Sequence, residues 1–582
     1  MKTIKLLAAL LAMALVAGCS KEPAETASAE SADLILTNAR VYTLNWDEPG
    51  MDGSVGPTAP RDAQGWHPDG QAVAIRGGRI QLVGTNGDAM QYEGAATRVI
   101  DLAGATVIPG LVDSHTHVFG LGAMLDQVNL VDVATEEDAI ALVVERAKSV
   151  PKGGWIVGRG WDEGAWANRY PDKKLLSAAV PDHPVFLDSL HGFAGWANQV
   201  ALDEAGITAD SLVPVGGEMR LGEDGQPNGL FLNQAVSMIS GAVPAPSRDT
   251  LTRQLLLGLN RMATDGYTAV HDAGLDAPAM SVLEELEASG QLPIRVYAML
   301  SLRDEELIHK WIEKGPDQDT DSMLVTRTVK AYYDGALGSR GARLLEDYSD
   351  KPGHRGISGD GYGFNQALNA QAMKAGFQIA IHAIGDAGNR EAIDILESVF
   401  REAPSTADNR HRVEHAQVIS PQDIPRLGQL GLIASMEPPH AMEDKTWAED
   451  RLGPQRILGA YAWRSLRKAG ARMSFNSDNP GSDHSIFYGL HSAIARQDKN
   501  HEPAGGWYPE QAMSADEAIR GYTTWSAYAS FRENETGILE TGRWADITVI
   551  NIDPFVLADE NPGAILDGHI VMTIVNGEVV YE

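Results

Sequence analysis

Two histidines separated by one residue, His115 and His117, end an apolar run in the segment 107–120 (VIPGLVDSHTHVFG). In an extended strand, alternate side chains point to the same side, so the two imidazoles converge on one face. Imidazole nitrogens are common ligands of zinc and other first-row divalent metals. A single H-x-H is also found where histidines are only structural, but the apolar strand and the Pro-Gly before this one favour a metal-binding pair.

Three further side chains of ligand type also follow apolar or β-branched runs. They are His382 in QIAIHAIGDAGN, His415 in HRVEHAQ and Asp478 in RMSFNSDNPGSD. One histidine at the end of a strand is more often structural than functional. Because the same arrangement recurs at several strand ends, the sequence predicts that these side chains meet at one site.

Lys330, in TRTVKAYYDGALGSRGA, is a less familiar candidate. A lysine that ends a strand and faces a barrel interior is costly to bury as a free ammonium ion. Reaction with carbon dioxide would convert its amine into a carbamate, whose anionic oxygen can bridge two metal ions. The alternatives are an ion pair with Asp334 and access to solvent.

Eight strand-like segments alternate with amphipathic, helix-like stretches through the middle of the chain. The strands are expected near 106–117, 267–273, 294–300, 328–334, 378–383, 410–416, 432–437 and 472–478. The helix-like stretches include 251–263, 392–400 and 421–430. Eight strands with helical crossovers indicate an α/β fold of the (β/α)8 TIM-barrel type, which carries active sites at the C-terminal ends of its strands.

The regions outside this pattern predict further domains. Short β-type runs fill 34–105 and recur in 535–582, with the glycines at 77–78 as a hairpin turn, so a small β-sandwich domain built from both termini is expected. Two unrelated strand clusters are the alternative. The barrel domain then spans 106–534. About residues 118–266 separate its first two strands, and this length predicts an inserted subdomain that caps the barrel mouth.

The first 19 residues are similar to a bacterial lipoprotein signal peptide. Lys2 and Lys5 precede an apolar run that is too short to span a membrane, and the run ends in LVAGC. We expect Cys19 to be lipidated and residues 20–33 to form a flexible polar tether. An exported cell-envelope lipoprotein is predicted, anchored in the outer membrane if the host is Gram-negative. A secretory peptide with a chance cysteine is the alternative.

Composition and charge limit the classes of partner. The 582 residues are 43% hydrophobic and 22% charged, as in a globular protein, and the net charge of −32 argues against nucleic acid as a partner. The single cysteine excludes an internal disulfide framework and a cysteine-rich zinc site. A small-molecule substrate is expected.

The order H-x-H, Lys, His, His, Asp on strands one, four, five, six and eight resembles the amidohydrolase superfamily. The phrases KAYYDGALGSRGA, HAIGDAGN, RVEHAQ, IASMEPPH and NSDNPGSD are similar to its amidohydrolase-3 branch, which includes N-substituted formamide deformylases. The resemblance runs from about Leu34 to the C-terminus. It implies the small β-sandwich and one or two divalent metal ions, zinc first among them, at the barrel mouth.

The resemblance also implies a role for each ligand-type residue. It makes six residues metal ligands: His115, His117, Lys330, His382, His415 and Asp478. The first two histidines and the aspartate would hold the more buried metal, the lysine would bridge to a second metal, and the other two histidines would bind that second metal. Attack by metal-bound hydroxide would cleave a non-peptide C–N bond of amide, N-acyl or N-formyl type, with Asp478 carrying the proton to the leaving group. A single-metal site is expected if the lysine is unmodified.

Candidate substrate contacts come from departures from the branch pattern and from residues near the expected site. In SLHGFAGWAN the branch usually has His where Phe193 stands, with His191 two residues earlier, and Glu437 replaces its usual Gln. The candidates are His271, Phe193, Trp161, Arg340 and Glu437. Packing within the insert is the alternative for Trp161, structural packing for His271, and a salt bridge within its loop for Arg340.

Other functions stay open at this point. A lactonase or a phosphotriesterase would use the same bimetallic site. A deaminase on this barrel uses one metal, lacks the strand-four lysine and carries Glu three residues after the strand-five histidine, where this chain has Gly385. A lipid-anchored solute-binding protein, from a different class, would have two lobes and no inward ring of metal ligands.

Overall fold

The computed structural model describes residues 30–131, 133–161, 166, 170–189, 194–214, 217–319 and 322–582. Cys19, the predicted signal peptide and most of the predicted tether lie outside this range, as do His191 and Phe193. Among the described residues, no helix combines the length and the apolar character needed to cross a membrane.

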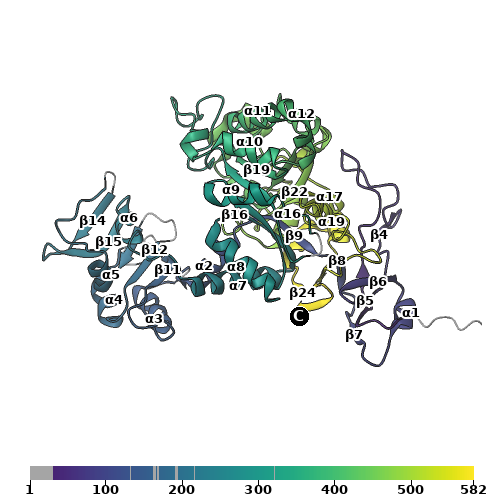
Figure 1. Ribbon diagram of the computed structural model, residues 1–582, viewed down its shortest axis with the longest axis horizontal. Helices are drawn as coiled ribbons and strands as arrows, with labels where there is room; N and C mark the ends of the chain where they lie inside the picture. Colours follow the sequence, from purple (N-terminus) through teal and green to yellow (C-terminus); the bar gives the residue numbers. More distant parts are fainter. Residues whose placement is uncertain are drawn as a thin grey trace, which may run out of the picture.

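A parallel sheet of eight strands forms the centre of the molecule (Figure 1). Its strands are β9 (Leu111–Thr116), β16 (Tyr267–Leu275), β17 (Arg295–Ser301), β18 (Leu324–Tyr332), β19 (Gln378–Ala383), β20 (Arg412–His415), β21 (Ile433–Met436) and β22 (Arg472–Phe475). They neighbour one another in chain order, as in a (β/α)8 barrel. Where β22 meets β9, the N–H of His117 donates to Asn479 O at 2.8 Å and the N–H of Asp478 donates to His115 O at 2.9 Å, so the barrel is nearly closed.

Each barrel strand overlaps a predicted range, but several of the predicted bounds were wrong. The predicted strand 106–117 is divided at Gly110 into β8 (Thr106–Pro109) and β9, and β8 pairs in a separate sheet. A Cβ on Gly110 would lie 2.2 Å from Thr268 Oγ1, so the chain can pass this point only with glycine. The fourth strand ends at Tyr332, and Asp334 beyond it accepts the backbone N–H groups of Ile384 and Gly385.

Helices between the strands cover the outside of the barrel (Figure 1). They include α7 (Arg248–Thr264), α8 (Ala277–Ala288), α9 (Glu305–Lys314), α10 (Gln366–Lys374), α11 (Asp386–Glu402) and α12 (Ile424–Gln429). Several begin at a side-chain cap: Ser247 accepts the N–H of Thr250, and Asp276 accepts that of Ala279. In α11 the buried residues Ala392, Leu396 and Val399 recur at helical spacing, which turns one face toward the strands.

Two small sheets lie beside the barrel, the first with strands from both ends of the chain and the second with strands from the N-terminal end. One is ordered β2 (Arg40–Val41), β8, β23 (Ile547–Ile550), β24 (Ile570–Val575) and β25 (Glu578–Tyr581); the other is ordered β6 (Arg79–Gly84), β5 (Ala72–Arg76), β1 (Leu34–Thr37) and β7 (Arg98–Asp101). Leu36, Val73, Val107 and Ile547 from the two sheets share one buried core. Gly77 and Gly78, at φ 55° and 75°, form the predicted hairpin turn between β5 and β6.

The folded part of the chain begins before the predicted tether ends. Ala32 is 3% exposed and its N–H donates to Tyr92 O at 2.8 Å. The carboxylate of Asp33 accepts the N–H of Gly77 at 2.7 Å. The last residues of the 20–33 segment are therefore part of the β-structure.

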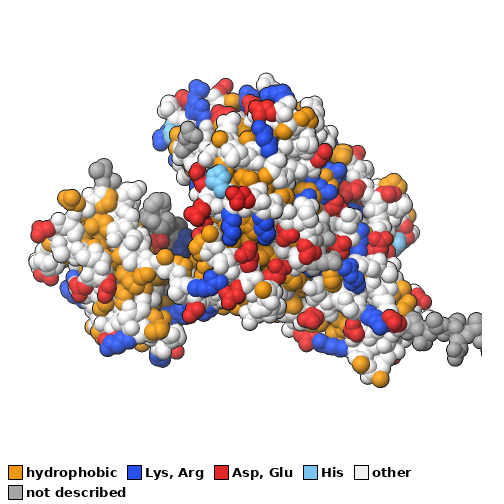
Figure 2. Space-filling model, in the orientation of Figure 1, with side chains coloured by type: hydrophobic (Ala, Val, Ile, Leu, Met, Phe, Trp, Pro, Cys, Tyr) orange, Lys and Arg blue, Asp and Glu red, His pale blue; other side chains and the backbone are white. Residues whose placement is uncertain are grey.

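A separate lobe carries a six-stranded sheet and lies within the predicted insert. The strands are ordered β10 (Val128–Asn129), β11 (Ile156–Trp161), β12 (Val185–Ser189), β13 (Ala194–Ala197), β15 (Pro227–Asn233) and β14 (Gly217–Leu221). Its described residues stand to one side of the barrel, and Figure 2 shows open space between the lobe and the upper part of the barrel. Asp126, at the end of α2 (Val118–Asp126), pairs with Arg146 of the lobe and Arg253 of α7 at the junction. Capping of the barrel mouth stays a prediction, because residues 162–165, 167–169 and 190–193 are outside the described range.

Candidate metal centre

The C-terminal ends of the barrel strands bring together all six predicted ligands: His115, His117, Lys330, His382, His415 and Asp478. Asp478 Oδ1 lies 3.2 Å from His117 Nε2 and 3.6 Å from His115 Nε2. Lys330 Nζ lies 2.8 Å from the same nitrogen of His115. The ring centroid of His415 is 5.2 Å from that of His115 and 4.4 Å from that of His382. Residues from five separate strands therefore converge on one small volume.

Two of these ligands depend on an unusual backbone conformation. Glu414 and His415 are consecutive in β20, and regular strand alternation would turn them to opposite faces. His415 instead has φ 71°, in the left-handed region, and Asp478 has φ 52°. The strand thus ends at His415 in a way that lets Glu414 and His415 both reach the centre. Left-handed backbone at non-glycine residues is costly and concentrates at functional sites.

Buried acceptors orient the first two histidines. His115 Nδ1 lies 2.5 Å from Glu414 Oε2, and His117 Nδ1 lies 2.8 Å from Ala273 O. With Nδ1 engaged in this way, Nε2 of each ring is directed toward Asp478. Arg412 holds the Glu414 carboxylate with bonds of 2.7 and 2.9 Å, so the acceptor is itself fixed. Supporting contacts of this kind are typical of metal-binding histidines.

Burial and neighbouring charges set the protonation states. Burial, with the Lys330 charge, lowers the pKa of His115 to about 4, and burial with the nearby His415 holds the pKa of His382 well below its usual value. Burial would raise the pKa of Asp478, but His117 and His115 hold it well below its usual value. These groups are therefore neutral imidazoles and a carboxylate near neutral pH, which are the forms that bind metals.

Lys330 has the properties of a modifiable amine. It is fully buried, and this burial lowers the pKa of its amine to about 8 although Glu414 and Asp478 oppose the shift. Its nitrogen contacts His115 rather than Asp334, so the ion pair considered from the sequence is not formed. Asp334 instead accepts the backbone N–H groups of Arg343, Ile384 and Gly385.

The donor set fits a divalent metal ion. One donor atom each from His115, His117 and Asp478 lie within 4.8 Å of one another. His382 Nε2 is buried and makes no hydrogen bond among the described residues, and Asp334 Oδ1 lies 3.7 Å from it. Imidazole nitrogens with a carboxylate oxygen suit zinc and similar ions.

The residues predicted to contact the substrate lie in different parts of the structure. Glu437 is at the centre, with Oε2 3.2 Å from His415 Nδ1. His271 is buried below the ligands, with Nδ1 2.9 Å from Arg412 Nη1, so it supports the site from beneath. Arg340 pairs with Asp350 at 2.7 Å within its loop, which is the alternative considered from the sequence, and its substrate role stays a prediction. Phe193 lies outside the described residues.

The structure contradicts the substrate role predicted for Trp161. Its side chain is fully buried and its indole N–H donates to Leu187 O at 2.9 Å. The rings of Trp166 and Trp196 lie 5.6 and 6.5 Å from it, inside the core of the lobe. The three tryptophans therefore pack that lobe.

Three site residues were missed in the sequence: Arg412, Glu414 and His440. Arg412 and Glu414 precede the predicted ligand His415 in RVEHAQ. Their i, i+2 spacing places them on one face of a strand that ends at the site, and this was the available signal. His440 lies in α13 (Pro438–Asp444), and Glu437 is the residue immediately before this helix. Its Nδ1 lies 3.5 Å from Glu437 Oε2.

Gly385 has a steric reason to be glycine. A Cβ at this position would lie 1.9 Å from Arg343 O, so no larger residue fits without moving the loop after β18. A glutamate, the residue that a deaminase carries here, therefore does not fit this backbone.

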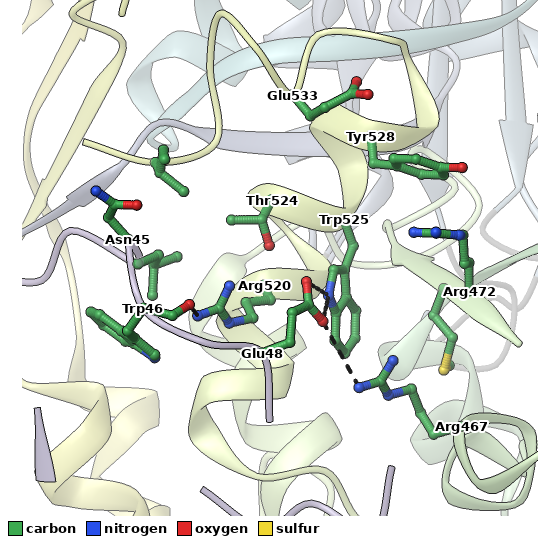
Figure 3. Close-up of a pocket in the computed structure, with 13 residues that line it drawn as sticks. Asn45, Trp46, Glu48, Arg467, Arg472, Arg520, Thr524, Trp525, Tyr528 and Glu533 are labelled. Carbon is green, nitrogen blue, oxygen red and sulfur yellow. Dashed lines mark hydrogen bonds and ion pairs between the residues drawn. The ribbon is translucent and has the colours of Figure 1, made fainter. Parts of the chain in front are cut away.

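A cavity of about 310 Å³ lies at the opposite end of the barrel (Figure 3). Arg472, the first residue of β22, lines it, whereas Asp478 follows the other end of the same strand. Trp525 donates its indole N–H to both oxygens of Glu48, at 3.1 and 3.0 Å. Arg520 donates to Trp46 O at 3.0 Å. The cavity is thus bordered by contacts that fasten the N-terminal segment to the barrel.

A nearly closed parallel barrel with imidazole, amine and carboxylate groups converging at its C-terminal rim defines a metal-dependent hydrolase. The chain belongs to the amidohydrolase family, which it matches over residues 98–581. The sequence-based assignment to the amidohydrolase-3 branch is confirmed. The chain is therefore an enzyme that acts on a small molecule with a divalent metal.

Known proteins agree with this assignment along most of the chain. It is 29% identical over 562 residues to the protein LONG AFTER FAR-RED 3 of Arabidopsis thaliana, covering 94% of this chain and 92% of that protein. It is 28% identical over 530 residues to the N-substituted formamide deformylase of Arthrobacter pascens, covering 88% and 95%. The crystal structure of an uncharacterized metal-dependent hydrolase from Pyrococcus furiosus is similar with a TM-score of 0.70 and 25% identity, over 90% of this chain and 99% of that one.

Proposed function

We propose that the chain hydrolyses a non-peptide C–N bond of amide, N-acyl or N-formyl type. The observation that carries the proposal is the convergence of His115, His117 and Asp478 beside the buried amine of Lys330. The similarity to an N-substituted formamide deformylase supports this class of bond. We further propose zinc as the metal, because two imidazoles and a carboxylate suit it.

The chain's own residues have distinct tasks in this reaction. His115, His117 and Asp478 would hold one metal, and His382 and His415 a second. A bound divalent metal polarises a carbonyl group and lowers the pKa of water. Asp478, an ionised carboxylate, is placed to accept a proton as water adds to the carbonyl carbon. It then returns this proton to the nitrogen as the C–N bond breaks, so that an acid and an amine leave.

Lys330 would link the two metal positions as a carbamate. Burial favours this modification because the charged ammonium form is disfavoured and the neutral amine is the form that reacts with carbon dioxide. The resulting carbamate carries negative charge into a site lined by imidazoles.

A substrate screen tests the proposal directly. Metal-loaded enzyme would be assayed on matched sets of N-formyl amines, N-acyl amines and lactones, with His117→Gln as the inactive control. Turnover of the C–N compounds that is lost on chelation and restored by added zinc is the expected result. Selective turnover of lactones, or turnover that survives removal of the metal, would reject it.

The two small sheets would together form the β-sandwich domain predicted from the sequence. Their common core of residues from both ends of the chain supports this organisation. The lobe 128–233 would be the subdomain inserted after the first barrel strand.

We also propose that the protein is exported and anchored through lipidated Cys19. The charged start, the apolar run and the LVAGC ending of the first 19 residues support this localisation. Cys19→Ser is expected to abolish incorporation of labelled palmitate in a bacterial host while leaving hydrolysis unchanged. Equal labelling of the variant would refute the anchor.

A further inference from the structure

A second group of metal-binding side chains lies beside the predicted ligands. It consists of His415 at the end of β20, Glu437 after β21 and His440 in α13. One donor atom from each lies within 4.8 Å of the others. We call this group the strand-seven triad. Glu437 Oε2 lies close to both imidazoles, at 3.2 Å from His415 Nδ1 and 3.5 Å from His440 Nδ1.

The spacing in this triad matches that of the predicted catalytic ligands. In the catalytic centre, Asp478 Oδ1 lies 3.2 Å from His117 Nε2 and 3.6 Å from His115 Nε2. Ligands about 2.0–2.2 Å from one tetrahedral zinc ion are separated by similar distances. The His115–Glu414 contact is different, because at 2.5 Å it is a direct hydrogen bond with no room for an ion between the atoms.

The donor atoms of the triad also lack other partners. Within the described part of the chain, His415 Nδ1 and Glu437 Oε1 are buried and make no well-directed hydrogen bond. Glu437 is 3% exposed, and its side chain has no arginine or lysine ion pair among the described residues. The two imidazoles balance this buried carboxylate when they are protonated, and a bound cation would take over that role. The His440 side chain, at 17% exposed, offers a route from solvent.

We propose that His415, Glu437 and His440 bind a divalent first-row metal ion, with zinc as the best match, at a site separate from that of His115, His117 and Asp478. Two imidazoles and one carboxylate are a known zinc ligand set that leaves a position open. His415 presents Nδ1 to this site, and its ring centroid lies 4.4 Å from that of His382 and 5.2 Å from that of His115. This inference depends on the proposed function at one point only, because His415 is also a proposed ligand of the catalytic centre.

Metal counting on the purified full-length enzyme tests this site without any substrate. Wild type and the variants Glu437→Gln, His440→Gln and His117→Gln would be loaded with zinc, desalted and analysed by plasma mass spectrometry. Glu437→Gln and His440→Gln should each lose one metal equivalent relative to wild type and keep the ion held by His117. Exposed His309→Gln on α9 and Glu306→Gln are matched controls that should lose none.

Cobalt absorption provides the second measurement. Cobalt-loaded wild type should show visible bands of the triad in addition to those of the catalytic centre. His440→Gln should remove the triad bands alone, and His117→Gln should leave them in place. Unchanged metal content and spectra in His440→Gln would overturn the proposal, because a Glu437 that only orients His415 does not need His440. Circular dichroism and the melting temperature identify variants that fail to fold, and His440→Asn then replaces His440→Gln. Failure of fully metal-loaded wild type to hydrolyse any C–N compound would count against the proposed function and would leave the triad proposal standing.

Discussion

The two ends of strand β22 carry buried charge in opposite ways. At the N-terminal end, near Arg472, charges are paired: Arg520 donates to Asp516 at 2.7 Å, and Arg464 donates to Glu517 at 2.6 Å (Figure 3 shows Arg520 in this region). At the C-terminal end, near Asp478, Lys330 contacts a histidine, and His382 Nε2 has no hydrogen-bond partner among the described residues.

This difference distinguishes a region that binds a ligand from a region that holds two segments of the chain together. A paired buried charge holds two segments together, and its loss leaves a costly unpaired partner. An unpaired buried donor or acceptor costs stability unless a ligand satisfies it, so it indicates a functional site. Substitutions at the C-terminal end should therefore reduce activity and spare stability, whereas substitutions at the N-terminal end should do the reverse.

The largest effect is expected for Asp478→Asn. The amide keeps the shape but cannot take a proton from water, so kcat/KM should fall by about 10³–10⁴-fold. The melting temperature should stay the same or fall slightly, because the amide oxygen can still accept from His117 although the attraction of the charge is lost. Asp347→Asn, at an exposed ion pair with Arg355, is the control and should keep full activity. Substantial turnover by Asp478→Asn would show that another group carries the proton.

Lys330→Ala should have the next largest effect. Without a carbamate the second metal loses its bridge, and kcat/KM should fall by about 10²-fold or more. Short carboxylic acids should restore part of the activity, and Lys330→Glu should retain more than Lys330→Arg, whose guanidinium cannot form a carbamate. Carbon-13 NMR after exposure to labelled carbon dioxide should show a carbamate signal in wild type alone. A Lys330→Ala variant that keeps its metal and its activity would leave a single-metal site.

Glu414→Gln should act more weakly, through His115. The amide still reaches the ring but no longer attracts the proton on Nδ1, so His115 Nε2 becomes a poorer donor. Metal affinity should fall by about 10–100-fold, measured by competition with a chelator. Activity at saturating metal should recover to within a few-fold of wild type. If affinity is unchanged, Glu414 serves only to neutralise Arg412.

The sequence predicted those parts of the fold and site that depend on local pattern. Strand ends such as QIAIH are visible as apolar runs closed by a ligand-type residue, and the barrel followed from their number and alternation. Residues that act through another residue were not predicted. Glu414 is a site residue because β20 ends at a left-handed His415, and Arg412 because it reaches Ser114 O at 2.6 Å across the barrel. The substrate role predicted for Trp161 was also wrong, because the core of a lobe and an apolar pocket are both rich in aromatic residues.

The smallest effect on catalysis should come from Trp525→Phe at the N-terminal end of the barrel. The substitution keeps the aromatic ring in the cavity of Figure 3 and removes only the N–H that donates to Glu48. Glu48 is 55% exposed on its side chain, so water replaces much of this bond and the loss should be about 1 kcal/mol. Urea unfolding should show the shift, and kcat/KM and metal content should equal those of wild type. Glu48→Ala should cause a similar small loss, because it removes the acceptor of the same contact between the N-terminal segment and the barrel. A fall in activity in either variant would mean that this end of the barrel is coupled to the metal centre through β22, and that charge pairing alone does not distinguish the two ends.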